Sequence, residues 1–277
     1  MITIENETLR VTINEVGALL TSVYLKKKNI EALWQADDKN SWPSQDVVMF
    51  PFIGVAKYSL DGVLHEGGRQ HGFARDSRFT VVEKAKDKVV LSYHDDKTSF
   101  ALYPYRFELR VTYSLSANKL HSHFEVTNRS ERTMPFMLGN HPGYRYSFFK
   151  GSVDLGPNQL SYLPVRENLS RKEEPFPYDG EISLTKDFFR HYETLVFVKG
   201  PAPKVNTGLG YSIVYHFVAD YCVLWSHPEK GDFLCVEPWW GVNQYEGKPL
   251  DLAKRKNITL LPKGKSKAFD NEVEFVY

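Results

Sequence analysis

Apolar and polar residues alternate with a period of two along most of this chain. The clearest runs cover residues 8–16, 79–95, 107–128, 212–226 and 232–239. A period of two places successive side chains on opposite faces of a β-strand, so each run predicts strands with one buried face. Turn sequences separate the runs, namely KAKDK, SANK, HPEKGD and KGKS. Residues 107–128 therefore predict one long hairpin, and residues 218–240 predict a second.

A helical pattern is found at one place, LTKDFFRHYETL at residues 184–195, which predicts a short helix. The chain has no repeat of 20–50 residues, no low-complexity tract and no change of composition that would mark a domain boundary. We therefore predict one all-β domain over residues 1–277, with large antiparallel sheets packed face to face.

Charge and hydropathy argue against several classes of partner. The chain carries 35 basic and 34 acidic residues, a balance that gives no electrostatic reason to bind nucleic acid or an anionic membrane. The N-terminal sequence MITIENETLRVTI has no apolar core of a secretory signal, and no run of about 18 apolar residues occurs. We expect neither secretion nor a membrane span.

The two cysteines, Cys222 and Cys235, lie on neighbouring apolar runs. Two cysteines flanked by large hydrophobic residues do not indicate a disulfide framework, so we predict buried free thiols in a reducing compartment. The expected location is the cytoplasm.

Three short stretches break the strand pattern and carry candidate chemistry: QHGFARD (70–76), LGNHPGYRY (138–146) and CVEPWWGVN (235–243). His141 ends a strand-like run and is followed by proline and glycine, a context that favours presentation to a small molecule. Glu237 ends the apolar run FLCV. An isolated buried carboxylate is costly, so Glu237 must be paired, hydrogen-bonded or shifted in pKa.

Each stretch also has an ordinary structural explanation. His71 serves equally well as a hydrogen-bonded structural histidine, Glu237 as half of a salt bridge, and the two tryptophans as core residues. His121 and His123 share one strand face, as metal ligands do, but no third ligand is near them in sequence. The chain also lacks the glycine-rich motifs that bind phosphates. We therefore expect no metal and no cofactor.

Several motifs together resemble the aldose 1-epimerase (galactose mutarotase-like) superfamily, in particular its LacX-like branch. They are FPFIG, QHGFARD, YPYRFELRVTYSL, MPFMLGNHPGYRY and LWSHPEKGDFLCVEPWWGVN, and their order and spacing agree over essentially the whole chain. The resemblance implies a β-supersandwich that interconverts the α and β anomers of an aldose without a cofactor.

The resemblance also implies roles for individual residues. Glu237 would be the general base that takes the proton from the anomeric hydroxyl, and His141 the general acid that protonates the ring oxygen. His71 would hydrogen-bond to the sugar and orient it. Apart from the resemblance, Trp239 is a candidate for sugar binding, because an aromatic face can stack on a sugar ring. A carboxylate and an imidazole suit this chemistry because both can exchange protons near neutral pH.

Two positions depart from the family pattern. Val55 stands where relatives usually have a substrate-binding arginine. Either Arg75 or Lys57 takes over that role, or the substrate preference of this chain differs. The aspartate that binds sugar hydroxyls in the family has no exact counterpart. Glu193 is the nearest match, with Asp187 as the fallback.

Alternative functions stay open at this point. A free hexose is the preferred substrate, and a hexose 6-phosphate would require arginines at the site, for which Arg75, Arg78 and Arg145 are candidates. A sugar-binding sensor without catalysis is a second alternative. A glycosidase or lyase would need a second carboxylate beside Glu237, and no motif supplies one. The expected partner is therefore a small sugar bound by a monomer or a weak homodimer.

Overall fold

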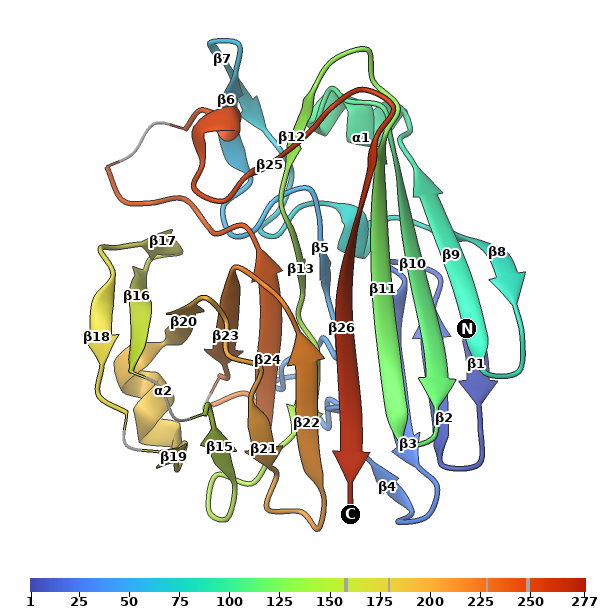
Figure 1. Cartoon of the computed structure of the whole chain (residues 1–277), viewed down its shortest axis with the longest axis vertical. Coiled ribbons are helices and arrows are strands. Elements are labelled where there is room, and N and C mark those ends of the chain that lie inside the picture. Colours follow the sequence, from blue (N-terminus) through green and yellow to red (C-terminus); the bar gives the residue numbers. More distant parts are fainter. Residues whose placement is uncertain (157–158, 179, 228, 248–249) are drawn as a thin grey trace.

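Two large antiparallel sheets dominate the computed structural model, which describes all residues except 157–158, 179, 228 and 248–249 (Figure 1). Within these described residues, each of the two sheets holds nine strands. The first sheet, at the front of Figure 1, has the order β19 (Glu181–Ile182), β15 (Ser152–Asp154), β21 (Lys204–Asn206), β22 (Ser212–Phe217), β26 (Ser266–Val276), β11 (Lys119–Asn128), β10 (Phe107–Ser116), β9 (Lys88–His94) and β8 (Thr80–Lys84).

The second large sheet carries most of the candidate residues. Its order is β17 (Leu169–Ser170), β16 (Leu160–Arg166), β20 (Thr194–Val198), β23 (Tyr221–Trp225), β24 (Phe233–Trp240), β13 (Leu138–Asn140) and β5 (Val48–Met49). Two further strands join its flanks, with β14 (Gly143–Arg145) paired to β24 and β18 (Glu174–Phe176) paired to β16.

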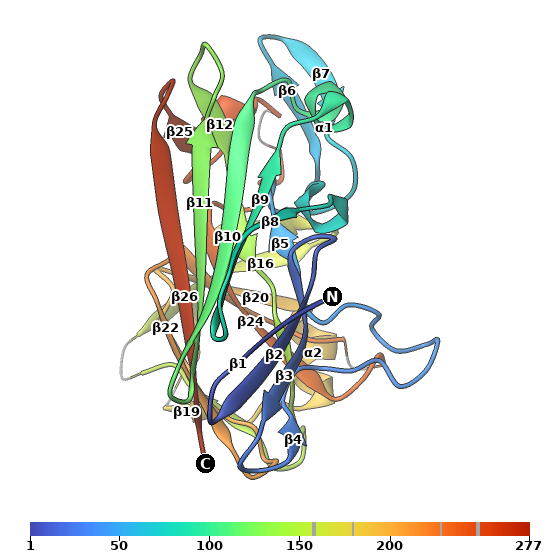
Figure 2. The same cartoon turned by 90° about the vertical axis from the view of Figure 1, so that its right-hand side faces the viewer.

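Smaller elements complete the described part of the chain. A third sheet, seen beside the first in Figure 2, consists of β1 (Ile2–Glu5), β2 (Leu9–Asn14), β3 (Leu19–Leu25) and β4 (Ile30–Glu31). Two strand pairs are β12 (Met134–Phe136) with β25 (Thr259–Leu261) and β6 (Lys57–Leu60) with β7 (Val63–Glu66). The helices are α1 (Lys97–Leu102), α2 (Lys186–Tyr192) and the 3₁₀ turns η1 (Ala74–Asp76) and η2 (Leu252–Lys254).

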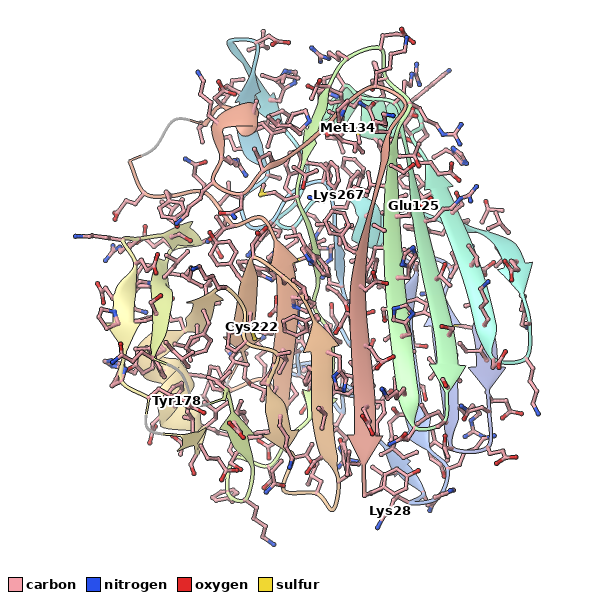
Figure 3. The ribbon with its side chains drawn as sticks, viewed as in Figure 1. Lys28, Glu125, Met134, Tyr178, Cys222 and Lys267 are labelled. Carbon is pink, nitrogen blue, oxygen red and sulfur yellow. The ribbon has the colours of Figure 1, made fainter. Side chains whose placement is uncertain are left out.

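Local sequence patterns predicted the main elements correctly. Residues 107–128 form the β10–β11 hairpin, and residues 221–240 supply β23 and β24, although residue 228 of the intervening turn lies outside the described residues. The expected helix at 184–195 is α2. Along β11 the buried and partly exposed positions alternate, and outward-facing members include Glu125 (Figure 3).

Aromatic side chains hold the two large sheets together and determine which face of β24 is free for a site. Trp240 packs against Phe269 of β26, with ring centroids 5.1 Å apart. Because side chains alternate along a strand, Trp239, Glu237 and Cys235 point to the opposite face, away from the first sheet. No helix among the described residues has the length and apolar character needed to cross a membrane.

The structure also places the histidine pair and the two cysteines in the sheets. His121 and His123 lie on one face of β11, and both contact Asp270 of β26, at 2.9 Å and 2.7 Å. Cys222 and Cys235 are buried and free, as predicted.

Candidate active site

A cavity of about 440 Å³ collects most of the residues predicted to carry chemistry. Its volume is typical of a small-molecule site. His71, Arg75, His141, Glu237 and Trp239 all line it. The other lining residues are Trp42, Pro43, Ser44, Val47, Gly54, Arg69, Gln70, Val165, Asn168, Thr194, Trp225 and Asn243.

Strand register sets His141 opposite Glu237. The pairs that flank them are Gly139↔Trp239, where β13 meets β24, and Gly143↔Cys235, where β14 meets β24. The register is the same before and after the gap between β13 and β14. Residue 141, midway between the two glycines, therefore faces residue 237, midway between Trp239 and Cys235. These two residues are His141 and Glu237, which lie 96 positions apart in sequence.

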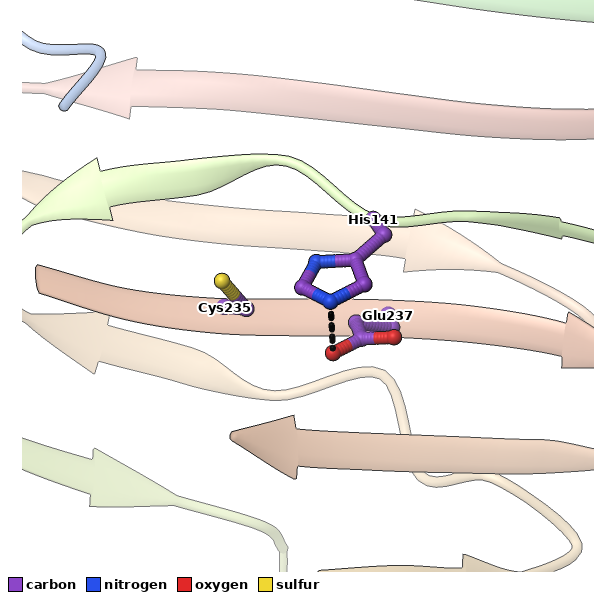
Figure 4. A group of neighbouring side chains, drawn as sticks. All are labelled: His141, Cys235 and Glu237. Carbon is purple, nitrogen blue, oxygen red and sulfur yellow. Dashed lines mark ion pairs between the residues drawn. The ribbon is translucent and has the colours of Figure 1, made fainter. Parts of the chain in front are cut away.

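Two prolines explain why the pairing is interrupted at this point. Pro142 and Pro238 have no N–H and cannot donate to a strand ladder. The N–H of His141 points the other way and donates to the carbonyl of Val47 at 2.9 Å. Antiparallel residues that do not hydrogen-bond to each other bring their side chains closest. His141 Nε2 accordingly lies 3.3 Å from Glu237 Oε1 (Figure 4).

Aromatic rings fix the orientation of the His141 imidazole. Trp42 stacks on it with ring centroids 5.4 Å apart and planes at 24°. Trp225 meets it edge-on at 5.3 Å. Trp42 is itself held by Phe233, whose ring stacks on it at 4.7 Å. This packing leaves His141 7% exposed, so its imidazole reaches the cavity through a narrow opening.

Burial shifts the pKa values of the two groups in opposite directions. Desolvation raises the pKa of Glu237 well above its ordinary value, although the Trp239 indole N–H donates to Oε2 at 2.9 Å and favours the carboxylate. Desolvation lowers the pKa of His141 well below its ordinary value, and the nearby His71 and Arg75 lower it further. Both shifts favour the uncharged forms of the pair, a protonated Glu237 and a neutral His141.

His71 is held in an unusual backbone conformation with one ring nitrogen directed into the protein. Its φ of 69° lies in the left-handed region, which residues other than glycine seldom adopt outside functional sites and tight turns. The N–H of Gly54 donates to His71 Nδ1 at 3.2 Å, so the ring proton resides on Nε2. Burial, with Arg75 and Arg69 nearby, lowers the pKa of His71 to about 3. His71 therefore offers the cavity a neutral N–H donor.

Arg75 and Arg69 are the arginines that line the cavity. Arg75 donates to Ser44 Oγ at 3.3 Å, and Arg69 pairs with Asp76 at 3.1 Å. Arg75 thus lines the cavity. The structure does not bring the other candidate cations there. Lys57 pairs with Glu66 on the β6–β7 hairpin, Arg78 lies 3.9 Å from Glu15, and neither Arg145 nor Val55 is among the lining residues.

The acidic residues expected to bind sugar hydroxyls are not in the cavity. Glu193 follows α2 with a φ of 58° and pairs with Arg166 at 3.1 Å on the exposed surface. Asp187 pairs with Arg190 within α2. The residue after Glu193, Thr194, lines the cavity instead. The motif suggested that residue 193 enters the cavity, but at the end of α2 it is residue 194 that does so.

Several cavity residues had no strong signal in the sequence. Trp42 lies in a loop without periodicity, and Asn168 lies in a turn before β17. Asn243 donates to the Asn168 carbonyl at 3.0 Å. It belongs to the CVEPWWGVN stretch, which was predicted to carry chemistry, but Asn243 was not itself predicted as a site residue. Trp225 could have been found from the hairpin, because it pairs with Cys235 on the face that carries Glu237.

Comparisons with known proteins agree with the geometry. The family model described as aldose 1-epimerase matches residues 1–260. Among curated proteins, the plasmid and chromosomal forms of the protein LacX from Lactococcus lactis subsp. lactis are each 28% identical. Each match covers 94% of this chain and 99% of the relative.

Solved structures give the same result. A galactose mutarotase related enzyme from Lactobacillus acidophilus is 27% identical, with a TM-score of 0.94 and coverage of 100% of this chain and 97% of that chain. A galactose mutarotase-like protein from Lactobacillus casei is 29% identical, with a TM-score of 0.93 and coverage of 99% of each chain. The galactose 1-epimerase of Lactobacillus acidophilus, at 17% identity and a TM-score of 0.74 over 99% of this chain and 93% of that one, shares the fold.

Proposed function

Because the chain belongs to the aldose 1-epimerase family, we propose that it interconverts the α and β anomers of a hexose by acid–base ring opening. The observation that carries this proposal is the buried pair of His141 Nε2 and Glu237 Oε1, 3.3 Å apart at the wall of the cavity. The anomeric hydroxyl and the ring oxygen are both bonded to the anomeric carbon. A donor and an acceptor that serve both oxygens must therefore be close neighbours.

In the proposed reaction one proton leaves the sugar and another enters it. The Glu237 carboxylate takes the proton of the anomeric hydroxyl while the His141 imidazolium donates one to the ring oxygen. The bond between the anomeric carbon and the ring oxygen breaks, and the aldehyde forms. Rotation about the C1–C2 bond presents the other face of the aldehyde. Ring closure returns both protons, with Glu237 now the acid and His141 the base.

Burial supports this exchange of roles. The open-chain state leaves Glu237 protonated and His141 neutral, and a low-dielectric site favours uncharged groups. The ring-closed state requires the carboxylate and the imidazolium, which stabilise each other at their short separation. Because these effects oppose each other, neither protonation state is strongly favoured over the other.

We assign sugar binding to the groups around this pair. His71 contributes its Nε2–H, Arg75 contributes a guanidinium, and Asn243 contributes an amide that already contacts Asn168. Trp239 offers an indole face along the cavity wall. A few directional polar groups among aromatic surfaces are typical of sites that bind small polar ligands.

The deciding experiment follows freshly dissolved α-glucose and α-galactose by polarimetry or by NMR exchange, with and without protein. We expect the approach to anomeric equilibrium to accelerate in proportion to protein concentration. Equal rates with and without protein, together with demonstrated sugar binding, would instead establish a sugar-binding protein without catalysis.

A hexose 6-phosphate is the second candidate substrate, and the presence of both Arg69 and Arg75 on the cavity wall favours it. Arginine binds phosphate well because its planar guanidinium donates two parallel hydrogen bonds. The two candidates are separated by comparing kcat/KM for glucose and glucose 6-phosphate. If the phosphorylated sugar is the substrate, R69Q and R75Q will lower kcat/KM for it more than for glucose.

We also propose a reducing compartment, the cytoplasm, as the location, because both cysteines are free and buried. Fractionation of cells that produce a tagged full chain tests this assignment.

A further inference from the structure

Arg255 is a buried cation that has no acidic partner among the described residues. Its side chain is only 7% exposed, and no neighbouring carboxylate stabilises its charge. Burial lowers the pKa of Arg255 to about 10, so the guanidinium stays charged at neutral pH. A buried charge without a counter-ion is costly. The compensation must therefore come from the few polar atoms that the guanidinium contacts.

Those atoms are two backbone carbonyls of the same loop. Arg255 directly follows the 3₁₀ turn η2, and its Nη2 donates to the Lys57 carbonyl at 2.8 Å. Its Nη1 donates to the Val55 carbonyl over a longer distance, 3.4 Å. The buried Nε has no partner among the described residues. One planar guanidinium thus connects two carbonyls that are two residues apart, and so restrains the backbone of residues 54–57, the 54–57 loop.

The 54–57 loop also holds His71 at two points. The Gly54 carbonyl accepts a hydrogen bond from the His71 N–H at 2.9 Å, and the Gly54 N–H donates to His71 Nδ1 at 3.2 Å. The second bond requires that Nδ1 carry no proton, so the ring proton lies on Nε2. The state of the His71 ring therefore depends on where the 54–57 loop places the Gly54 N–H.

Close packing at Gly54 makes this dependence steep. A Cβ on Gly54 would lie 2.4 Å from Asn243 Cβ, so the loop already touches a second residue of the cavity wall. A loop that is no longer held at residues 55 and 57 can move away from Asn243, and the Gly54 N–H then leaves His71 Nδ1. Without that donor either ring nitrogen can carry the proton, and a His71 protonated at Nδ1 no longer has its donor at Nε2.

We propose that Arg255 is a positioning residue for His71: by holding the 54–57 loop it keeps the ring proton on Nε2, where it can donate to the sugar. Arg255 is not among the described residues that line the cavity, so it acts without touching the substrate. The effect on sugar binding rests on the proposed function, whereas the effect on the His71 ring does not.

The first arm of the test is NMR of the full chain with ¹⁵N-labelled histidine rings, which shows which ring nitrogen carries the proton. The H71N spectrum assigns the His71 signals. The parent chain should show His71 protonated at Nε2, and R255Q should show it protonated partly at Nδ1. R255K should give a smaller change, because lysine keeps the charge but donates from a single nitrogen.

R129M is the control for a general loss of stability. It removes an arginine that pairs with the buried Glu108 of β10, away from the 54–57 loop. Thermal unfolding shows whether each variant is folded and how much stability it has lost. R129M should lose stability and leave the His71 signals unchanged.

The second arm measures KM and kcat for α-glucose. R255Q should raise KM by about 3–10-fold and change kcat little, as expected for the loss of one neutral hydrogen bond to the sugar. R255Q combined with H71N should raise KM no further than H71N alone, because two residues that act through one contact are not additive. R129M should leave KM unchanged.

Unchanged His71 signals or an unchanged KM in R255Q, or in R255K should R255Q not fold, would overturn the inference. So would effects of R255Q and H71N on KM that multiply in the double variant. A His71 proton that moves as expected, in a chain whose parent form does not accelerate mutarotation, would instead overturn the proposed function and leave the positioning of the ring in place.

Discussion

At the scale of single residues, the acid–base pair gives the most direct prediction. E237Q and H141N should each lower kcat by about 10²-fold or more, because each removes one of the two proton transfers. D187N and H216N are matched controls, since they make the same chemical changes at exposed positions on α2 and β22. Polarimetry with α-glucose measures all four variants. Rates for E237Q or H141N within a few-fold of the parent chain would remove that residue from the mechanism.

The pH dependence of the rate tests the same pair in another way. Adding a second proton to the pair gives a neutral Glu237 and a charged His141, a state with no base, so the rate should fall toward acid pH. Because burial raises the pKa of Glu237, we expect this acid limb to disappear in E237Q. The limb belongs to the coupled pair, not to either residue alone. An acid limb that persists in E237Q would point to another carboxylate.

His71 should affect substrate binding more than turnover. H71N tests this, because asparagine tolerates the left-handed backbone at this position and so preserves the loop. Loss of one neutral hydrogen bond predicts that KM rises by about 3–10-fold while kcat changes little. Because the pKa of His71 is lowered to about 3, its contribution to KM should be constant from about pH 5 to pH 8. A change confined to kcat would contradict the assignment.

At the scale of secondary-structure elements, the close packing of β14 gives a prediction about the imidazole. A Cβ at Gly143 would lie 2.5 Å from Trp42 Cζ3, and Trp42 stacks on His141. G143A should therefore displace Trp42, lower the free energy of unfolding by about 1–3 kcal/mol and reduce kcat. Urea unfolding and polarimetry measure the two effects.

Gly139 provides the matched control on the same face of the neighbouring strand β13. A Cβ there meets the flexible end of Met49 at 2.4 Å, and methionine can adjust its rotamers to make room. G139A should therefore cost less activity than G143A. Equal losses in the two variants would show that the Trp42–His141 stack does not matter for turnover.

The elements also show what the sequence could and could not predict. The β10–β11 hairpin, β23, β24 and α2 follow from period and turn chemistry, which are local properties. The pairing of His141 with Glu237 depends on a strand contact between distant segments, so the motifs suggested the pair but could not place it. Glu193 was misplaced because a single residue at a helix end decides whether Glu193 or Thr194 enters the cavity. Trp42 could not be found because loops carry no periodicity.

At the scale of the whole molecule, Asp46 connects the sheets behind the site. It accepts hydrogen bonds from the Leu20 N–H of β3 at 3.2 Å and from Asn140 of β13 at 2.8 Å. Asn271 of β26 donates in turn to Asn140 at 2.9 Å. Asp46 is fully buried, and desolvation raises its pKa from 3.8 to about 6.

The raised pKa of Asp46 predicts that the free energy of unfolding depends on pH, and that the D46N variant lacks this contribution. Between about pH 4 and pH 6 the unfolded chain loses the Asp46 proton while the folded chain keeps it, so the folded state loses stability as pH rises. The shift corresponds to up to about 3 kcal/mol. The free energy of unfolding of D46N, relative to the parent chain, should therefore increase by this order from pH 4 to pH 7. Urea unfolding across this range measures it, and a difference independent of pH would contradict the prediction.

The extent of the domain is tested by comparing two probes of unfolding. One cluster of buried side chains runs from Ile2 to Phe275, and the C-terminal strand β26 lies between β22 and β11 in the first sheet. This continuity supports our proposal that residues 1–277 form one domain, so they should unfold in one cooperative transition.

The positions of the tryptophans allow the two probes to report on different parts of the molecule. All five, at positions 34, 42, 225, 239 and 240, lie in or beside the second sheet, so their fluorescence reports on that region, whereas far-UV circular dichroism reports on every strand. For one domain the two urea curves coincide, and a bound sugar moves both to higher urea concentration by the same amount. If β1–β4 or the first sheet formed a separate unit, the circular dichroism curve would split from the fluorescence curve, and sugar would shift only the part that carries the site.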